Sequence, residues 1–389
     1  MSARGDSVRR WLDERDARMR EALRALVERS SFTADRDGVV SALDALESML
    51  PSHWNRQRIS SETSGGHLIV HGGRAAREGG AILVGHIDTV FARDVFSGYR
   101  EEPGDIARGP GVLDMKGGLI VTLFGLLAAE AEGRALAPWT WVIVGDEEIG
   151  SPEGAPLLRE QAQGASCALV FESGRAHDAI ITQRKGTGSL TVRATGVAAH
   201  AGNAHDKGRN ALWSLARWVD AAQSLTDYAR GVTVNVGTLH GGTSKNTVPD
   251  RATAEVDIRF VLAEDRAFLQ SALARLAAER ALEGTTIALE WGPGRAPLVR
   301  TQASAALRAQ YAACQRDSGL GDGESPLVGG GSDASTTSDA GVASIDALGV
   351  RGEGFHTVRE YAELRTLAPK AEALARFLAT VPAENAAPA

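Results

Sequence analysis

Cysteine is nearly absent from this 389-residue sequence, which contains only Cys167 and Cys314. Two cysteines exclude a disulfide-rich scaffold and argue against a structural zinc site of cysteine thiolates. Both lie in apolar or helix-like segments, so we expect buried small hydrophobic residues and not nucleophiles. Such low use of cysteine is typical of the reducing cytoplasm, which is the predicted location.

Long apolar runs and targeting signals are also missing. The longest apolar run, 118–129, has about twelve residues, whereas a helix needs about twenty to cross a bilayer. Residues 1–28 mix arginine with acidic side chains and contain no apolar core, so we expect neither a secretory signal nor a transit peptide. These absences predict a soluble protein with no membrane partner.

An excess of basic residues is missing as well. The 49 acidic residues outnumber the 42 basic ones and give a net charge of -7, which argues against nucleic-acid binding. What remains is a globular composition, with 43% hydrophobic and 23% charged residues. The length is sufficient for two or three domains.

The apolar pattern predicts an α/β protein. Helices are predicted over 8–30, 39–49 and 117–131. Short apolar runs between glycines are typical of buried strands, and they occur at 67–71, 81–84 and 139–144. Because strands alternate with helices, we expect a mainly parallel sheet whose working residues lie at the carboxyl ends of its strands.

A different pattern begins near residue 188. It predicts strands over 188–197, 232–239, 252–261 and 285–291, with helices over 209–225 and 264–282. The order βαββαβ is that of a ferredoxin-like unit. Because α/β character returns afterwards, we interpret residues 184–297 as an inserted lid and dimerisation domain. Residues 1–183 and 298–389 then form a discontinuous catalytic domain.

The first chemical motif, Gly-His-Ile-Asp-Thr-Val from Gly85, follows a predicted strand. Residues i and i+2 of an extended chain point to the same side, so Asp88 can lie beside His86. A carboxylate beside an imidazole fixes its tautomer and raises its basicity, as it does behind metal-bound histidines. Taken alone, this motif fits a structural histidine better.

The glycine-rich turn 109–118 leaves two interpretations open. Glycines ahead of a helix can cradle a phosphate, although the spacing is not that of a P-loop. Alternatively, the turn presents Asp114 as a carboxylate at the end of a strand.

Three consecutive acids, 146–148, follow the strand predicted over 139–144. They form either a surface turn or a buried group, and buried unpaired acids are costly unless a cation compensates them. Adjacent side chains point in different directions, so one of Glu147 and Glu148 could bind a metal while the other acts as a free base.

Two further candidates complete a set of five. Glu172 ends another apolar strand, and His356 lies near the C-terminus; they join His86, Asp114 and Glu148. If the aspartate bridges, each of two ions receives one histidine, one glutamate and the shared aspartate. This nitrogen and oxygen set is suited to zinc or similar divalent ions about 3.5–4 Å apart.

At this point the sequence resembles the di-zinc metallopeptidases that include bacterial glutamate carboxypeptidase, aminoacylase, acetylornithine deacetylase and succinyl-diaminopimelate desuccinylase. The resemblance covers about 23–378 and rests on the motifs at 85–90, 109–118 and 145–151. The glutamate carboxypeptidase branch is most similar, through Phe171-Glu172, the segment 329–334 and the ending His356-x3-Glu-Tyr361.

The resemblance implies a role for each candidate in the predicted catalytic domain. His86 and Glu172 would hold one zinc, Glu148 and His356 the other, and Asp114 would bridge them. Asp88 would orient His86, and Glu147 would be the general base for the bridging water. The resemblance also implies a cis peptide bond between Asp114 and Met115.

The resemblance assigns residues of the inserted domain as well. His200 would reach across a dimer to the scissile carbonyl as an oxyanion donor. Asn246 and Arg259 would contact the substrate carboxylate, which suits the forked guanidinium of an arginine. The chain departs from the family at His205, where relatives often have proline, so the local loop is expected to differ.

The resulting prediction is a zinc-dependent metallopeptidase or amidohydrolase, of carboxypeptidase type, that works as a homodimer formed through the inserted domain. It would bind two Zn²⁺ per chain, with Co²⁺ or Mn²⁺ as substitutes. It would cleave an amide or peptide bond next to a free carboxylate of a small-molecule substrate, by a metal-bridging water that Glu147 activates.

Three alternative functions compete with this prediction. An N-acyl-amino-acid deacylase shares every catalytic residue and remains open. A catalytically silent carboxylate-binding relative is less favoured, because the ligands, Glu147 and His200 are all present. A di-metal phosphoesterase fits the metal ligands, but the adjacent glutamate base favours amide hydrolysis. Among other residues, we expect Trp213 and Trp218 to be packing residues and His67 to be structural or on the surface.

Overall fold

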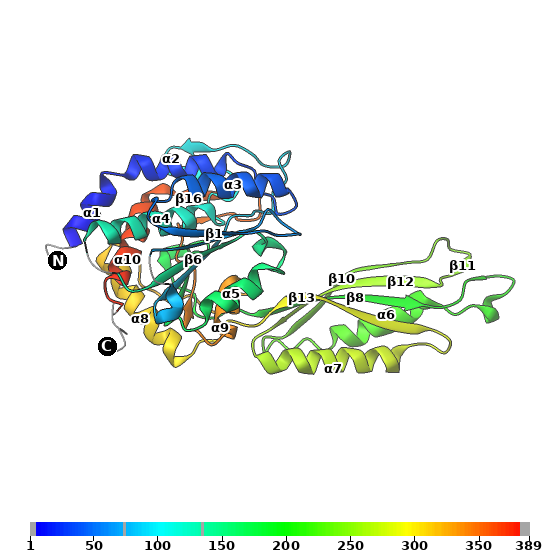
Figure 1. The fold of residues 1–389 in the computed structure, drawn as a ribbon. Helices are drawn as coiled ribbons and strands as arrows, with labels where there is room; N and C mark the ends of the chain where they lie inside the picture. Colours follow the sequence, from blue (N-terminus) through cyan, green and yellow to red (C-terminus); the bar gives the residue numbers. More distant parts are fainter. Residues whose placement is uncertain (1–4, 73–74, 134–135, 382–389) are drawn as a thin grey trace. The chain divides into compact units, whose positions relative to one another are not determined.

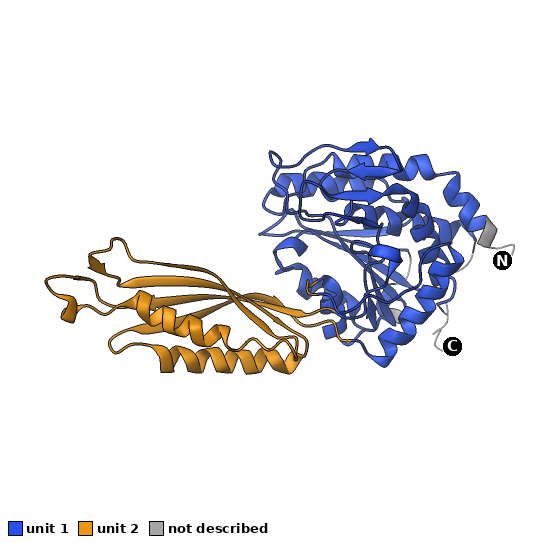
Figure 2. Cartoon of the chain, turned by 180° about the vertical axis from the view of Figure 1, so that it is seen from behind, with its two compact units in different colours: residues 1–183, 300–328, 332–389 blue, residues 184–299, 329–331 orange. Residues whose placement is uncertain are grey.

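The computed structural model describes residues 5–72, 75–133 and 136–381, and these divide into two compact units. Unit 1 consists of the described residues up to Gln183 together with 300–328 and 332–381, and unit 2 consists of 184–299 and 329–331. Figure 2 colours the two units separately. Each has its own cluster of buried apolar side chains.

The main sheet of unit 1 has six strands in the order β1-β2-β6-β3-β7-β14. Their bounds are β1 (Asn55–Ile59), β2 (His67–His71), β3 (Ala81–His86), β6 (Trp139–Val144), β7 (Cys167–Val170) and β14 (Ser344–Ile345). The pairs β6–β3, β3–β7 and β7–β14 are parallel, and the pairs of β2 with β1 and β6 are antiparallel. The predicted α/β class with a mainly parallel sheet is therefore confirmed.

Helices surround this sheet (Figure 1). They are α1 (Gly5–Asp13), α2 (Asp16–Val27), α3 (Arg36–Ser48), α4 (Lys116–Ala131), α5 (Gly154–Ala162), α8 (Gln302–Asp317), α9 (Asp333–Asp339) and α10 (Leu367–Leu378). Helix α4 packs on β3 and is covered by α10, whereas α5 and α9 contact each other and the strands β6 and β7 respectively. The prediction of one helix over 8–30 was wrong, because the chain breaks between α1 and α2.

The start of α4 lies unusually close to the end of β7. A Cβ atom added at Gly118 would lie 2.0 Å from the carbonyl oxygen of Phe171, so only glycine allows this approach. The close packing brings the segment before α4, which contains Asp114, next to the segment after β7, which contains Glu172.

A second, four-stranded sheet of unit 1 was not predicted. It has the order β15-β16-β5-β4, with β4 (Arg100–Glu102), β5 (Ile106–Arg108), β15 (Gly352–Glu353) and β16 (Tyr361–Glu363). Its strands have two or three residues each, which is too short to produce a visible period in the sequence. The sheet joins the chain ahead of Asp114 to the chain around His356.

Unit 2 has the predicted order βαββαβ. Its elements are β8 (Gly186–Thr195), α6 (Ala211–Gln223), β10 (Thr233–Gly241), β12 (Arg251–Phe260), α7 (Ala263–Arg280) and β13 (Thr286–Arg295). The sheet order β10-β12-β8-β13, antiparallel throughout, is that of a ferredoxin-like fold. Alternate residues of β12, from Ala252 to Phe260, are buried in the apolar cluster that α6 and α7 also contribute to.

The remaining elements are short. A two-stranded ladder joins β9 (Ala199–His200) to β11 (Thr247–Val248). Single 3₁₀ turns are η1 (Ala76–Glu78), η2 (Glu147–Ile149), η3 (Ala176–Asp178), η4 (His205–Lys207) and η5 (Leu364–Thr366). Within the described ranges, no helix combines the length and the apolar character needed to cross a membrane.

Candidate active site

Three candidate segments of unit 1 meet at the carboxyl ends of parallel strands. His86 ends β3, η2 with Glu147 and Glu148 follows β6, and Glu172 follows β7. In a parallel sheet these ends lie along one edge, which is where ligands bind in open α/β folds. The segment before α4 adds Asp114, and the turn between β15 and β16 adds His356.

The candidate metal ligands form two groups that share Asp114. One group is His86, Asp114 and Glu172, and the other is Asp114, Glu148 and His356. Asp114 Oδ1 lies 3.4 Å from His86 Nε2, and Asp114 Oδ2 lies 3.4 Å from His356 Nε2. The two carboxylate oxygens of one aspartate therefore face two different imidazoles.

The two glutamates lie at similar distances from the histidines of their groups. Glu172 Oε1 lies 3.7 Å from His86 Nε2, and Glu148 Oε2 lies 3.1 Å from His356 Nε2. Within each group the potential ligand atoms all lie within 4.8 Å of one another. The structure thus brings together the five residues that the sequence predicted to act jointly.

The pKa shifts of these residues show that buried carboxylates and imidazoles interact strongly, as expected where a cation can bind between them. Burial, together with the charge of Asp114, raises the pKa of Glu172 well above its usual range. Burial opposes ionisation of Asp114, but hydrogen bonds with His356 and His86 hold its pKa far below the usual range. Hydrogen bonds to Asp114 and Glu148 raise the pKa of His356 to about 10.

One atom of the set has only a long contact with His86. Asp114 Oδ1 is buried and accepts no hydrogen bond of good geometry from the part of the chain that the structure describes. A buried carboxylate oxygen without a donor is costly, and a metal ion would satisfy it. One imidazole and two carboxylates per group is a donor set that divalent ions such as zinc accept.

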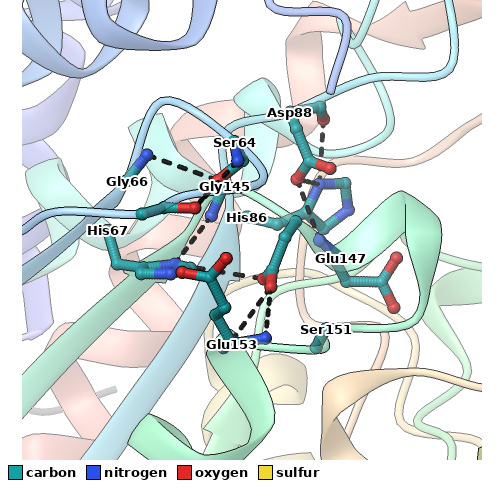
Figure 3. A network of polar contacts seen from close by, with 12 residues as sticks. Ser64, Gly66, His67, His86, Asp88, Gly145, Glu147, Ser151 and Glu153 are labelled. Carbon is teal, nitrogen blue, oxygen red and sulfur yellow. Dashed lines mark hydrogen bonds and ion pairs between the residues drawn. The ribbon is translucent and has the colours of Figure 1, made fainter. Parts of the chain in front are cut away.

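Asp88 connects His86 to the turn that carries the two glutamates (Figure 3). His86 Nδ1 lies 3.0 Å from the backbone oxygen of Asp88 and 3.4 Å from its Oδ1. The Asp88 carboxylate also accepts hydrogen bonds from the backbone N–H groups of Glu147 and Glu148, both at 3.2 Å. Thr33 Oγ1 donates to the same carboxylate at 2.7 Å. Asp88 is fully buried and therefore holds three parts of the site in fixed positions.

The three consecutive acids have different surroundings. Asp146 is fully buried, and its Oδ2 accepts hydrogen bonds from the backbone of Glu153 and Gly154, at 2.8 and 3.0 Å. Glu148 lies among the ligand groups, and Glu147 is partly exposed. The backbone N–H of Glu147 donates to Asp88, whose backbone oxygen lies 3.0 Å from His86 Nδ1, and this links Glu147 to the first group.

His67 is structural, in agreement with the prediction. It is buried, and its Nδ1 accepts a hydrogen bond from Gly145 N at 3.2 Å (Figure 3). This bond fixes the chain at the end of β6, just ahead of the acids. Both cysteines are also buried, and burial raises the pKa of each thiol to about 11, which disfavours a nucleophilic role.

The glycine-rich turn does not offer a phosphate cradle. The backbone N–H groups of Gly111, Leu113 and Asp114 already donate to the carboxylate of Glu360. The turn therefore binds the carboxylate of Glu360, and these N–H groups are not available to a phosphate. The peptide bond between Asp114 and Met115 is cis, as the resemblance implied.

Within unit 2, His200 and Asn246 lie side by side. His200 pairs with Thr247 across the β9–β11 ladder, and Asn246 O accepts a hydrogen bond from Ala201 N at 2.9 Å. The Nδ1 atom of His200 accepts hydrogen bonds from the backbone of Gly202 and Asn203, both at 3.1 Å. These bonds favour the tautomer that carries its proton on Nε2, and the side chain is exposed.

Arg259 lies in the four-stranded sheet of unit 2, at the end of β12 away from the β9–β11 ladder. Arg251 pairs with Thr195 at the end of β12 nearest to β9 and β11, whereas Arg259 pairs with Thr187 at the other end. The eight residue steps between Arg251 and Arg259 span about 26 Å in an extended strand. Within one copy of unit 2, His200 and Arg259 therefore cannot contact the same small molecule.

The surroundings of Arg259 and of the two tryptophans of unit 2 differ in part from the predictions. Arg259 forms a bidentate ion pair with Asp257, with both contacts at 2.8 Å, so part of its fork is already occupied. Trp218 is fully buried as predicted, but the prediction that Trp213 packs was wrong, because 61% of its surface is exposed. The two tryptophans are five residues apart, about 140° around the helix, and cannot share its buried face.

Sequence comparisons agree with this geometry. The sequence profile of a family described as a peptidase dimerisation domain matches residues 182–285. Carboxypeptidase G2 of Pseudomonas sp. (strain RS-16) is 28% identical over 368 residues, which cover 92% of this chain and 88% of that protein. These findings support the M20 family of metallopeptidases for this chain.

Solved M20 relatives share the fold. A tripeptidase from Staphylococcus aureus matches with a TM-score of 0.75 at 19% identity, over 94% of this chain and 98% of that one. An M20 family metallo-carboxypeptidase from Sulfolobus solfataricus matches with a TM-score of 0.70 at 16% identity, over 92% and 98% of the two chains. The curated relatives support the predicted reaction class, a hydrolase of the peptidase type. Together with the two groups of potential ligands, they also support metal binding.

Proposed function

We propose that the chain is a di-metal carboxypeptidase-like hydrolase that cleaves an amide or peptide bond next to a free carboxylate. The observation that supports it is the pair of ligand groups sharing Asp114, with Glu147 next to the ligand Glu148 and bound through its N–H to Asp88. His86, Asp114 and Glu172 would hold one Zn²⁺, and Asp114, Glu148 and His356 the other, with Co²⁺ or Mn²⁺ as substitutes. When bound, the two ions would polarise the scissile carbonyl and lower the pKa of an attacking water.

Glu147 is the proposed general base. It would take a proton from the water as the oxygen bonds to the carbonyl carbon, and it would give that proton to the amine nitrogen as the C–N bond breaks. The Asp88 carboxylate holds the backbone N–H of Glu147 at 3.2 Å, which fixes the position from which the base acts. The partly exposed Glu147 side chain can be reached by substrate and water.

His200 is the proposed donor to the oxygen of the tetrahedral intermediate. Because backbone N–H groups occupy Nδ1, its Nε2–H is available as a donor without protonation of the ring. The neighbouring Asn246 receives a hydrogen bond from Ser244 Oγ on its Oδ1, at 2.7 Å, so that its amide N–H₂ can donate to a substrate oxygen.

Arg259 is the proposed partner of the substrate carboxylate. Its pairing with Asp257 orients the guanidinium but uses Nε and one terminal nitrogen. The other terminal nitrogen donates to the backbone oxygen of Gly329 at 3.4 Å, a long bond that a carboxylate could replace. Since Arg259 and His200 lie at opposite ends of unit 2, their joint action requires two copies of the chain.

A homodimer formed through unit 2 is therefore part of the proposal. The match of residues 182–285 to a peptidase dimerisation domain supports it. Unit 2 also exposes large apolar side chains, among them Trp213, Leu239, Phe268 and Trp291. We further propose the cytoplasm as its location, on the ground that both cysteines are free.

The experiment that tests the proposal combines metal analysis with a substrate panel. We expect two zinc ions per chain, hydrolysis that stops on chelation, and recovery on adding zinc. Glu147→Gln should lower kcat by about 10²–10⁴-fold and leave the metal content unchanged, because Glu147 is not a ligand. Glu153→Gln is the matched control, since Glu153 follows η2 and contacts Thr63.

The panel should vary the acyl group and the amino acid independently. Preference for an N-aminoacyl group supports a carboxypeptidase, whereas preference for a simple acyl group supports the N-acyl-amino-acid deacylase. Near-normal turnover by Glu147→Gln would contradict the mechanism. Two bound metals without turnover of any amide would support a silent carboxylate-binding protein, and absence of metal would refute the ligand assignment.

A further inference from the structure

Glu360 is a fully buried carboxylate with no role in the mechanism proposed above. Its Oε1 accepts hydrogen bonds from Leu113 N at 2.8 Å and from Asp114 N at 3.0 Å. Its Oε2 accepts one from Gly111 N at 3.2 Å. One side chain, distant in sequence, therefore binds three backbone donors of the short segment that carries Asp114.

The same residue belongs to the turn that presents His356. Glu360 N donates to Thr357 O, and Thr357 N donates to Gly354 O, both at 3.0 Å, so backbone bonds close the turn on both sides of His356. The adjacent strand β16 pairs with β5, which precedes the Asp114 segment. Glu360 is thus a direct link between two segments that each supply a ligand to the second group.

The link acts on the backbone, close to the ligand atoms. Asp114 is held through its own N–H, and its Oδ2 lies 3.4 Å from His356 Nε2. Gly111 has a φ of +74°, a conformation that turns its N–H toward Glu360 and that residues with a Cβ seldom adopt. Partners that support metal ligands in this way commonly change metal affinity by about 10–100-fold when they are removed.

A purely structural role is the competing explanation. Any buried carboxylate that satisfies three backbone donors stabilises the fold, and its loss leaves those donors without partners. That explanation predicts lower stability and an unchanged metal centre. The two explanations therefore differ in how metal binding responds, and not in how stability responds.

We propose that Glu360 is a positioning residue that sets the separation of Asp114 and His356, and thereby the affinity and coordination of the second metal ion. This inference rests on the proposed metal centre. It assigns a function to the last part of the motif His356-x3-Glu-Tyr361. Glu360 itself contacts neither metal nor substrate.

The test is a titration of the metal-free full-length protein with Co²⁺, followed by visible absorption, on the wild type and on Glu360→Gln. Glutamine keeps the shape of the side chain but replaces one acceptor oxygen by a donor, which opposes a backbone N–H. Asp178→Asn is the matched control. Asp178 is also buried, accepts a hydrogen bond from Gly321 N at 3.1 Å and pairs with Arg351 at 3.0 Å, away from both ligand groups.

We expect Glu360→Gln to bind the second Co²⁺ at least about tenfold more weakly than the wild type, with an altered absorption spectrum. Asp178→Asn should lower the unfolding temperature of the metal-free protein but keep the wild-type titration. A lower unfolding temperature of Glu360→Gln with wild-type Co²⁺ affinity and spectrum would overturn the inference and leave the metal centre intact. Failure of the wild type to bind Co²⁺ would instead refute the metal centre, and this inference with it.

If Glu360→Gln does not fold, the same titration on Glu360→Asp decides the question. Aspartate keeps the charge but withdraws the carboxylate by one methylene, so it cannot reach Gly111 and Leu113 together. The expected result is again weaker binding of the second Co²⁺, and an unchanged titration would again overturn the inference.

Discussion

In the proposed mechanism, His200 of one chain acts on the substrate bound by the other chain. This can be tested by restoring activity in a mixed dimer of two inactive variants. The perturbation is to combine Glu147→Gln, which removes the proposed base, with His200→Ala, which removes the proposed oxyanion donor, in two differently tagged chains. Purification on both tags yields dimers with one chain of each kind. Each chain then lacks one catalytic residue and keeps the other.

The expected magnitude follows from the geometry of unit 2. Because about 26 Å of strand β12 separates Arg259 from the end nearest to His200, a substrate that uses Arg259 of one chain must use His200 of the other. In the mixed dimer, the site of the His200→Ala chain keeps its own Glu147 and receives His200 from its partner. One of the two sites is complete, so the mixed dimer should show about half of the wild-type kcat per dimer.

The assay is steady-state hydrolysis of the preferred panel substrate by the two parents and the mixed dimer. Glu147→Gln should be about 10²–10⁴-fold slower than the wild type, and His200→Ala about 10²–10³-fold slower. A half-active mixed dimer is thus clearly above either parent. The dimer of Glu147→Gln with a wild-type chain is the control, and it should also be half-active.

Action in cis predicts the opposite result. If His200 served the site of its own chain, both sites of the mixed dimer would be incomplete, and its activity would equal the mean of the two parents. That result, obtained while the control dimer remains half-active, would refute the assignment of Arg259 and His200 to one substrate. Light scattering at the assay concentration measures the oligomeric state. A wild-type protein that is monomeric there and fully active would refute the proposed dimer.

Two further predictions concern stability. Trp218→Ala should lower the free energy of unfolding in urea by about 3–5 kcal/mol, because Trp218 is fully buried in the core of unit 2, whereas Trp213→Ala should change it by about 0.5 kcal/mol. Lys370 faces Asp178 at 3.5 Å, and burial lowers its pKa to about 8. Between pH 8 and about 10.4 the unfolded chain binds a proton that the folded chain lacks, so this group raises the free energy of unfolding by about 3 kcal/mol as the pH rises. Urea titrations of Lys370→Met at the two pH values should lack that rise, and an equal rise in the variant would contradict it.

The predicted fold agreed with the structure where burial produces a regular pattern. Strands β2, β3 and β6 are continuous apolar runs because helices cover both faces of the main sheet. Strand β12 alternates because α6 and α7 cover only one face of its sheet. Short elements gave no such pattern. The two-residue strands β9 and β11 owe their position to the neighbouring sheet and not to their own sequence.

The candidate ligands could be predicted because they follow strands in a parallel sheet. Once β3, β6 and β7 are adjacent, His86, the Glu147–Glu148 pair and Glu172 must lie along one edge. Asp88 was predicted as the partner of His86, but the partners of Asp88 itself were not predicted. Thr33 donates to Asp88 from a loop before α3, and no sequence pattern around either residue predicts this contact.

The acidic residues of the site divide into those that face the proposed ions and those that hold backbone. Asp88 accepts the N–H groups of Glu147 and Glu148, and Glu360 accepts the N–H of Asp114. Both carboxylates are fully buried, so water does not compete for them. Each therefore holds the backbone N–H groups of the segment that carries the proposed ligands. On the proposed ligand assignment, a change in either residue would shift ligands without removing any. Metal affinity and turnover can therefore vary among chains with an identical ligand set, and the positions to compare are those of Asp88 and Glu360.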